Sequence, residues 1–206
     1  MHLFGAWGRR SSGRITLAGH PTPGNPAAAL RAGIALVSED RRRFGLHLEE
    51  PVRFNLSLSS LRELSRGGLL RRHAEDERNA DGARAVGLRV DKLTTPAGRL
   101  SGGNQQKVVL GKALMTRPRV VLLDEPTRGI DIGAKREIYQ LIDGLRTQGC
   151  AVLLVSSELP ELIGLSDRIL MLRDGTVGGR FDDVETMEPE SLMRAAIGTA
   201  DTTGAC

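Results

Sequence analysis

Short apolar runs, separated by stretches with helical spacing, dominate the pattern of hydrophobic and polar positions along this chain. The first run, residues 34–37, is predicted to be a buried strand. The later runs 120–123, 151–155 and 169–172 suit strands of a sheet that is covered on both faces. Because helical patterns separate these runs, the sequence predicts an α/β fold.

Turn-forming residues divide the rest of the chain. An alternating stretch between Gly13 and Gly19 predicts a hairpin, and prolines then interrupt regular structure. Asn25 before Pro26 is typical of a helix start, so a short helix is expected over 27–32, ending at Gly33. Residues 51–90 have helical spacing, which Gly67 and Gly68 divide into two segments.

The C-terminal part combines a hairpin and a helix. Asp174 and Gly175 lie between two apolar runs and predict a two-residue hairpin turn. A helix is expected from about Pro189 to Ile197. The last residues, 198–206, are expected to be disordered.

Composition narrows the class of protein. With 40% hydrophobic and 26% charged residues, the chain of 206 residues is expected to be one soluble globular domain. Its two cysteines lie far apart in sequence, and neither a membrane-spanning run nor a signal peptide is seen, so a cytoplasmic location is expected. The basic run at Arg41–Arg43 would permit nucleic-acid binding. We expect none, because 25 acidic residues are interspersed and only 3% of residues are aromatic.

A polar glycine turn gives the strongest chemical signal. Leu100, Ser101, Gly102, Gly103, Asn104 and Gln105 open a helix that is expected to run to about Thr116. Free N–H groups and the positive end of the helix dipole at such a start suit a terminal phosphate, and Ser101 adds a hydroxyl donor. Taken alone, a turn of this kind is more often structural.

Two adjacent carboxylates follow the next buried strand. Asp124 and Glu125 come directly after the run 120–123. Carboxylates in this position could fix Mg²⁺ and orient a water molecule. Acidic residues at strand ends are otherwise often solvated.

These segments, in this order, resemble the ATP-binding cassettes of ABC ATPases. LSGGNQQK resembles the signature motif, LLDEPT the Walker B strand and Gly129-Ile130-Asp131 the D-loop. DEPTRGIDIGAK and Ser156-Ser157-Glu158 are similar to the second cassette of ribose, galactose and xylose importers. Glu39-Asp40-Arg41 is similar to their Q-loop region, which faces the membrane-spanning subunits.

The resemblance implies an α/β, P-loop NTPase-like cassette with a helical subdomain, and ATP and Mg²⁺ as cofactors. Asp124 and Glu39 would lie at the metal, and Glu125 would polarise the attacking water. Asp131 would mediate communication across a dimer. Ser101, Gly102 and Gly103 would reach the γ-phosphate held by an opposite cassette, and the cofactor-binding residues would extend from Leu100 to Gln105.

The sequence departs from this family at three points. No P-loop pattern G-x-x-x-x-G-K-[ST] is found, and Gly111-Lys112 is interpreted as structural. The resemblance begins at about Leu3, so the cassette is expected to lack its P-loop strand and helix. Glu39 stands where many cassettes have glutamine, and Ser157 where most have a histidine that senses the γ-phosphate. Both changes should weaken hydrolysis at the chain's own site.

The expected organisation is therefore one incomplete ATP-binding domain. Residues 1–45 would form the hairpin and Q-loop region, 46–99 the helical subdomain, 100–180 the signature, Walker B, D-loop and H-loop region, and 181–206 a tail. The missing segment should expose strand edges, so the isolated chain is expected to be poorly soluble or loosely packed.

Three functions stay open. The leading hypothesis is the ATP-binding component of a monosaccharide importer, located at the inner face of the membrane. Its partners would be a second cassette with a P-loop, the permease subunits and, indirectly, a periplasmic or lipoprotein sugar-binding protein. The alternatives are a non-catalytic remnant or interaction module, and a soluble ABC ATPase of DNA repair or translation.

Overall fold

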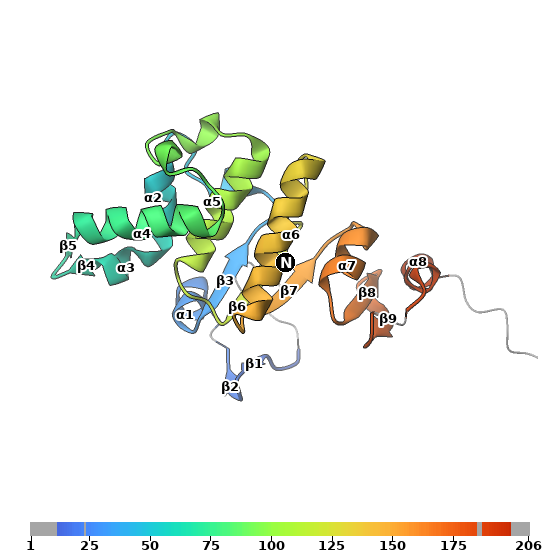
Figure 1. Cartoon of the computed structure of the whole chain (residues 1–206). Helices are drawn as coiled ribbons and strands as arrows, with labels where there is room; N and C mark the ends of the chain where they lie inside the picture. Colours follow the sequence, from blue (N-terminus) through green and yellow to red (C-terminus); the bar gives the residue numbers. More distant parts are fainter. Residues whose placement is uncertain (1–11, 23, 185–186, 199–206) are drawn as a thin grey trace, which may run out of the picture. The chain divides into compact units, whose positions relative to one another are not determined.

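The computed structural model describes residues 12–22, 24–184 and 187–198, which form two compact units divided after Val155 (Figure 1). The resemblance at Leu3–Gly5 and the predicted disorder after Gly198 lie outside the described residues. The expected organisation as one incomplete ATP-binding domain stays a prediction.

A parallel sheet of three strands forms the centre of the first unit. β3 (Ile34–Val37), β6 (Val120–Asp124) and β7 (Ala151–Val155) lie in the order β3-β6-β7. Ile34 is opposite Val120, and Val120 is opposite Ala151. The strands predicted over 34–37, 120–123 and 151–155 are therefore confirmed.

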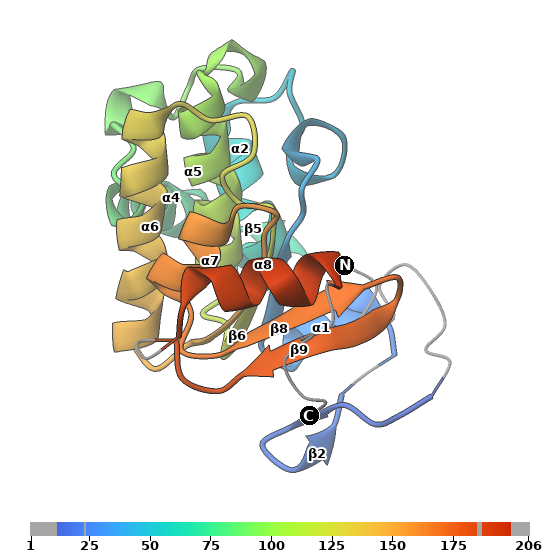
Figure 2. The same ribbon diagram turned by 90° about the vertical axis from the view of Figure 1, so that its right-hand side faces the viewer.

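Different helices cover the two faces of this sheet. Ala29 of α1 (Pro26–Arg31) packs on Ile34 and Leu122, on the same face as Leu36 and Val120. Alternate residues such as Val37 and Leu123 are fully buried on the other face, toward α5 (Gly102–Leu114) and α6 (Ile132–Thr147). Figure 2 shows α5 and α6 side by side in this unit.

The prediction that every apolar run is covered on both faces is wrong for β7. Its residues Ala151, Leu153 and Val155 share the face on which α1 lies, yet they are exposed. In the part of the chain that the structure describes, β7 pairs with β6 alone. The physical reason is that α1 is only six residues long and packs on β3 and β6.

The run 169–172 is also not a strand of a covered sheet. β8 (Ile169–Arg173) pairs with β9 (Thr176–Phe181) as a separate antiparallel hairpin in the second unit. Ile169 is buried with Leu192 of α8 (Pro189–Ile197), whereas Leu170 and Leu172 point to the uncovered face and are 61% and 69% exposed. The hairpin is covered on one side because α8 lies across it (Figure 2).

Both predicted hairpins and both terminal helices are confirmed. β1 (Thr16–Leu17) pairs with β2 (His20–Pro21), and Asp174 and Gly175 both have positive φ in the β8-β9 turn. The Asn25 side chain accepts a hydrogen bond from the Ala28 N–H at 2.9 Å and so caps α1. The second unit also contains α7 (Leu159–Leu165).

The helical subdomain contains more elements than its spacing predicts. Its helices are α2 (Val52–Ser57), α3 (Leu61–Leu64) and α4 (Arg72–Ala85). Gly67 and Gly68 do separate two helical segments, but as the turn between strands β4 (Ser65–Arg66) and β5 (Leu69–Leu70). Short turns complete the first unit: Arg41–Gly45, Leu58–Ser60, Val90–Lys92 and Ala97–Arg99.

Helix α5 joins this subdomain to the sheet. At Gly111 a Cβ atom would lie 2.7 Å from Cδ2 of Leu56, so the Leu56 side chain of α2 packs directly on the backbone of α5. The neighbouring Lys112 donates a hydrogen bond to the Gly45 carbonyl, and burial lowers the pKa of Lys112. The structural interpretation of Gly111-Lys112 is therefore confirmed.

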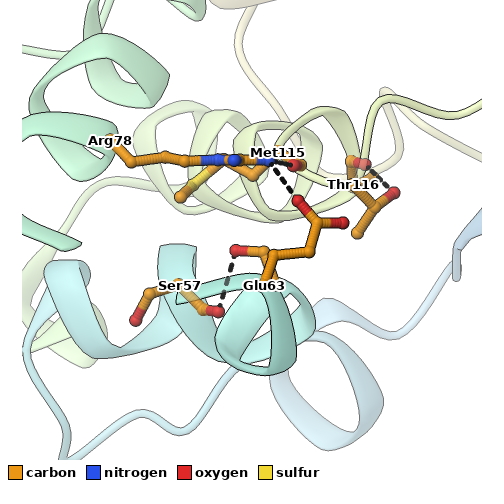
Figure 3. Close-up of polar contacts among 7 residues, drawn as sticks. Ser57, Glu63, Arg78, Met115 and Thr116 are labelled. Carbon is orange, nitrogen blue, oxygen red and sulfur yellow. Dashed lines mark hydrogen bonds and ion pairs between the residues drawn. The ribbon is translucent and has the colours of Figure 1, made fainter. Parts of the chain in front are cut away.

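Side chains of the helical subdomain hold the carboxyl end of α5 (Figure 3). Nη2 of Arg78 donates to the Met115 carbonyl at 2.6 Å and forms an ion pair with Glu63 at 2.9 Å. The Thr116 hydroxyl donates to the Ala113 carbonyl at 2.7 Å. The helix ends at Leu114, close to the predicted Thr116, and the carbonyl groups of Ala113 and Met115 at this end accept hydrogen bonds from these side chains.

The close contact at Gly111 predicts the effect of a methyl group there. We expect Gly111→Ala to lower the free energy of unfolding by about 1–3 kcal/mol, because Leu56 is fully buried and cannot move aside. Gly144→Ala in α6 is the matched control, since a Cβ atom there meets nothing within 4 Å. Urea unfolding should show Gly144→Ala to be more stable than the wild type by about 0.5–1 kcal/mol. Equal stability of the two variants would contradict the packing argument.

Candidate functional site

Helix α5 begins at the signature turn as predicted. Ser101 is its N-cap, and the Ser101 side chain accepts a hydrogen bond from the Asn104 N–H at 3.4 Å. Among the described residues, no protein atom accepts from the N–H groups of Gly102 and Gly103. Leu100 is half-buried and Ser101 is exposed, so the turn has a hydroxyl and a helix start at the surface. This arrangement suits an anion.

The two glycines of the turn have steric roles within the chain itself. A Cβ atom at Gly103 would lie 2.5 Å from Cβ of Ala134, where α5 crosses the first turn of α6. A Cβ atom at Gly102 would lie 2.9 Å from Nη2 of Arg41. Gln105 is buried, and its side-chain amide donates to the Ala97 carbonyl at 3.3 Å. The contact of Gln105 with the cofactor stays a prediction. In the structure, the bond from Gln105 to Ala97 anchors the signature turn on its buried side.

The paired carboxylates lie at the carboxyl end of the central strand. Asp124 ends β6 opposite Val155, and the Glu125 N–H donates to the Val155 carbonyl at 2.9 Å. Glu125 has a φ of 48°, in the left-handed region that a glutamate rarely adopts. Strain of this kind is of order 1–3 kcal/mol and is concentrated at functional sites. The sequence did not predict this conformation, which marks Glu125 independently of any motif.

Asp131 begins α6. Its side chain accepts a hydrogen bond from the Ala134 N–H at 2.9 Å, so the carboxylate caps the helix. The preceding turn passes through Gly129, whose φ is 67°. The cap gives Asp131 a structural role beside the predicted one in communication across a dimer, which stays a prediction.

Glu39 does not lie in an acidic pocket. Its carboxylate forms an ion pair with Arg128, in the turn that follows Glu125. The neighbouring Arg41 reaches the same turn, where it donates to the carbonyls of Arg128 at 3.0 Å and Gly129 at 3.4 Å. Burial and the adjacent Arg42 lower the pKa of Arg41, and Asp40 partly offsets this.

The sequence did not identify Arg41 and Arg128 as members of the site. Arg41 was interpreted as part of a basic run and of the segment similar to a Q-loop region, and Arg128 as part of the DEPTRG segment, but neither was given a role in the site. Their pairing across 87 residues could not be found from local patterns. Together they link the Glu39 region, the D-loop turn and the signature turn.

Ser157 lies in the second unit, just before α7. The Ser156 hydroxyl accepts a hydrogen bond from the Glu158 N–H at 3.0 Å and orders this segment. The catalytic role expected for Ser157 stays a prediction.

Of the two carboxylates predicted to lie at Mg²⁺, only Asp124 is not paired with Arg128. Across residues 12–22, 24–184 and 187–198, no group of three or more His, Cys, Asp or Glu residues could hold a metal ion. Mg²⁺ typically takes one or two protein carboxylates and completes its shell with water and substrate phosphates. Asp124 can supply such a carboxylate, whereas Glu39 would first have to leave Arg128.

A cavity of about 910 Å³ lies elsewhere in the first unit, away from these residues. It is bordered by α1, the hairpin β1-β2 and the end of α5, and its lining includes Leu30, Arg31, Ser60, Arg62 and Arg117. None of the residues predicted for the nucleotide site lines it.

Comparison with known proteins gives a consistent result. A family model described as ABC transporter matches residues 4–128. The ribose import ATP-binding protein RbsA 1 of Agrobacterium fabrum is 47% identical over 199 residues, which cover 96% of this chain and 39% of that protein. RbsA 2 of Rhizobium johnstonii is also 47% identical over 199 residues, covering 96% and 38%. The chain thus spans about two fifths of the length of these relatives.

Solved structures support the same fold. The ATP-binding cassette MJ1267 of an ABC transporter superposes with a TM-score of 0.79 at 19% identity, covering 96% of this chain and 80% of that one. CbiO1 from Clostridium perfringens, described as part of the ABC transporter complex cbiONQ, gives 0.72 at 20% identity, covering 95% and 74%. The α/β cassette fold is therefore shown.

The effect of the Asp131 cap on stability can be measured separately from the predicted role of Asp131 in communication across a dimer. We expect Asp131→Ala to lower the free energy of unfolding by about 1 kcal/mol, because the Ala134 N–H loses its acceptor. Asp131→Asn should stay within a few tenths of a kcal/mol of the wild type, because asparagine caps equally well. Thermal and urea unfolding of both variants measure this. If Asp131→Ala is as stable as Asp131→Asn, the cap does not stabilise α6.

Proposed function

The chain belongs to the ATP-binding cassette family of ABC transporters, and we propose that it is part of the energy-coupling ATPase of a monosaccharide importer. In this proposal it completes an ATP site at an interface with a second cassette. The observation that carries the proposal is the signature turn, where an exposed N-cap hydroxyl and unpaired helix N–H groups lie at the start of α5.

The chemistry of this turn explains why a partner is needed. A helix start stabilises a terminal phosphate that is already held elsewhere, because its donors and its dipole act at short range. The described residues include no P-loop to hold the remaining phosphates. A second cassette that carries a P-loop would supply that part, and the Ser101 hydroxyl with the Gly102 N–H would contact its γ-phosphate.

The residues after β6 have a supporting role in the proposal. Asp124 would take part in holding Mg²⁺, which neutralises the phosphate charge when bound. Glu125, held at positive φ, would orient a water molecule in the chain's own half of the interface. Glu39 is paired with Arg128 and is therefore not available to the metal, which favours a weakened site in that half.

The choice of transport substrate rests on the relatives. Proteins named ribose import ATP-binding protein match 96% of this chain at 46–47% identity. We therefore propose permease subunits as direct partners, with a sugar-binding protein acting through them. No helix in the described part of the chain is both long and apolar enough to cross a membrane. Attachment at the inner membrane face would thus come through the permease.

The signature turn can be tested without unfolding α5. Ser101→Asp keeps a strong N-cap but places a negative charge where the γ-phosphate would bind. In the presence of a P-loop cassette and permease in proteoliposomes, we expect ATP hydrolysis to fall at least ~10-fold, since removal of one donor to a developing charge has effects of 10²–10³. The rate of phosphate release measures this, and thermal unfolding checks the cap.

Two further variants sharpen the result. Asn25→Asp adds the same charge at the N-cap of α1 and should leave hydrolysis unchanged. Asp124→Asn should reduce hydrolysis less than Ser101→Asp, because the proposal places the active nucleotide on the partner's P-loop. Wild-type hydrolysis in Ser101→Asp would refute the composite site. A larger loss in Asp124→Asn would instead place the active nucleotide in this chain's own half.

A further inference from the structure

Resting on the proposed function, we propose that Arg41 is a positioning residue for the composite ATP site. It fixes three segments as one unit: the turn Arg41–Gly45, the turn 128–131 and the signature turn at Ser101–Gly103. The signature glycines and the D-loop then keep one geometry relative to each other, independently of the nucleotide.

The guanidinium of Arg41 bridges two successive carbonyl groups. Nη1 donates to the Arg128 carbonyl at 3.0 Å, and Nη2 donates to the Gly129 carbonyl at 3.4 Å. A planar fork can grip two acceptors at once, which a lysine ammonium does not reproduce. The bridge fixes the backbone just before Asp131, at the point where Gly129 takes a φ of 67°.

The same guanidinium lies against the signature turn. At Gly102 a Cβ atom would meet Nη2 of Arg41 at 2.9 Å and the Gly129 carbonyl oxygen at 3.2 Å. The side chain of Arg41 and the backbone of Gly129 therefore form the surface on which Gly102 rests. A shift of either one would leave a gap or cause a clash at Gly102, whose N–H is proposed to contact the phosphate.

A second interaction grips the turn 128–131 from its other side. The side chain of Arg128 forms an ion pair with Glu39, two residues before Arg41. The segment around residues 39–41 thus contacts both the side chain and the carbonyl of Arg128. This pair is largely exposed, whereas the half-buried Arg41 side chain bonds to two backbone carbonyl groups, so the Arg41 bridge is the better candidate for rigidity.

The turn Arg41–Gly45 is itself fixed along α5. A Cβ atom at Gly45 would lie 3.0 Å from Cγ2 of Val109, and the Lys112 ammonium donates to the Gly45 carbonyl. The Asp40 side chain accepts from the Arg43 N–H at 3.0 Å and starts the turn. The turn that carries Arg41 is therefore held against α5 at Val109 and Lys112 through Gly45, while Arg41 itself lies against Gly102.

The chain offers a matched set of variants to test this. Arg41→Ala removes the bridge, Arg41→Lys keeps the charge without the fork, and Arg42→Ala removes an adjacent exposed arginine. In proteoliposomes with a P-loop cassette and permease, we expect both Arg41 variants to lower kcat by about 10- to 100-fold, the scale of a misplacement of about 1 Å. KM for ATP should change less than about threefold, because the partner's P-loop holds the nucleotide. Arg42→Ala should match the wild type.

Amide hydrogen exchange of the same variants tests positioning without reference to turnover. Residues 128–131 should exchange faster in Arg41→Ala and Arg41→Lys than in the wild type and Arg42→Ala, because the turn loses its bridge. Exchange in β6 should stay unchanged, which would show that the sheet remains folded.

The outcomes separate this inference from the proposed function. If Ser101→Asp abolishes hydrolysis while either Arg41 variant keeps wild-type kcat, the role of Arg41 is overturned and the composite site stands. Unchanged exchange at 128–131, or an equal loss of kcat in Arg42→Ala, also overturns it. If Ser101→Asp itself keeps full activity, the proposed function fails and the inference falls with it.

Discussion

Close packing of helix α5 is the constraint on which the rest of the first unit depends. The helix touches α6 at Gly103 and α2 at Gly111, and at both points a Cβ atom would lie less than 3 Å from a neighbouring side-chain carbon. Direct contact of this kind fixes the axial position of a helix, because packed interiors leave no room for a shift. The signature turn, at the amino end of α5, takes its position from these two contacts.

Polar contacts then hold the two ends of this helix. At the carboxyl end, Arg78 and Thr116 satisfy the last carbonyl groups, and Arg78 is kept in place by Glu63. At the amino end, Ser101 caps the helix, and Arg41 donates a hydrogen bond to the Arg128 carbonyl in the neighbouring turn 128–131. Within the described part of the chain, no protein atom accepts from the first helix N–H groups at the amino end, which is therefore the end that suits a ligand. Because the two ends of α5 differ in this way, the proposed phosphate contact is assigned to the amino end.

The strands of the central sheet differ in how completely they are covered. β3 and β6 are buried on both faces, whereas one face of β7 is exposed and, among the described residues, β7 pairs on one side only. An edge strand with exposed Leu153 and Val155 has unpaired backbone groups and apolar side chains available to another chain. This agrees with the expectation of poor solubility for the isolated chain, which stays a prediction. In the proposal, ATP hydrolysis also depends on a second cassette, so the signature turn of this chain forms only one part of an ATP site.

The sequence by itself determined the elements and the motifs. Short apolar runs located β3 and β6, Asn25 and the polar glycine turn at Ser101 marked helix starts, and Asp174-Gly175 marked a turn, because these signals act within a few residues. Tertiary structure alone decided that β7 and β8 are not covered on both faces, since an apolar run does not encode how many layers pack on it. It also decided the pairing of Arg41 with the turn 128–131 and the positive φ of Glu125. Contacts between residues 87 positions apart arise only when the strands and α5 have packed, so no local pattern could have predicted them.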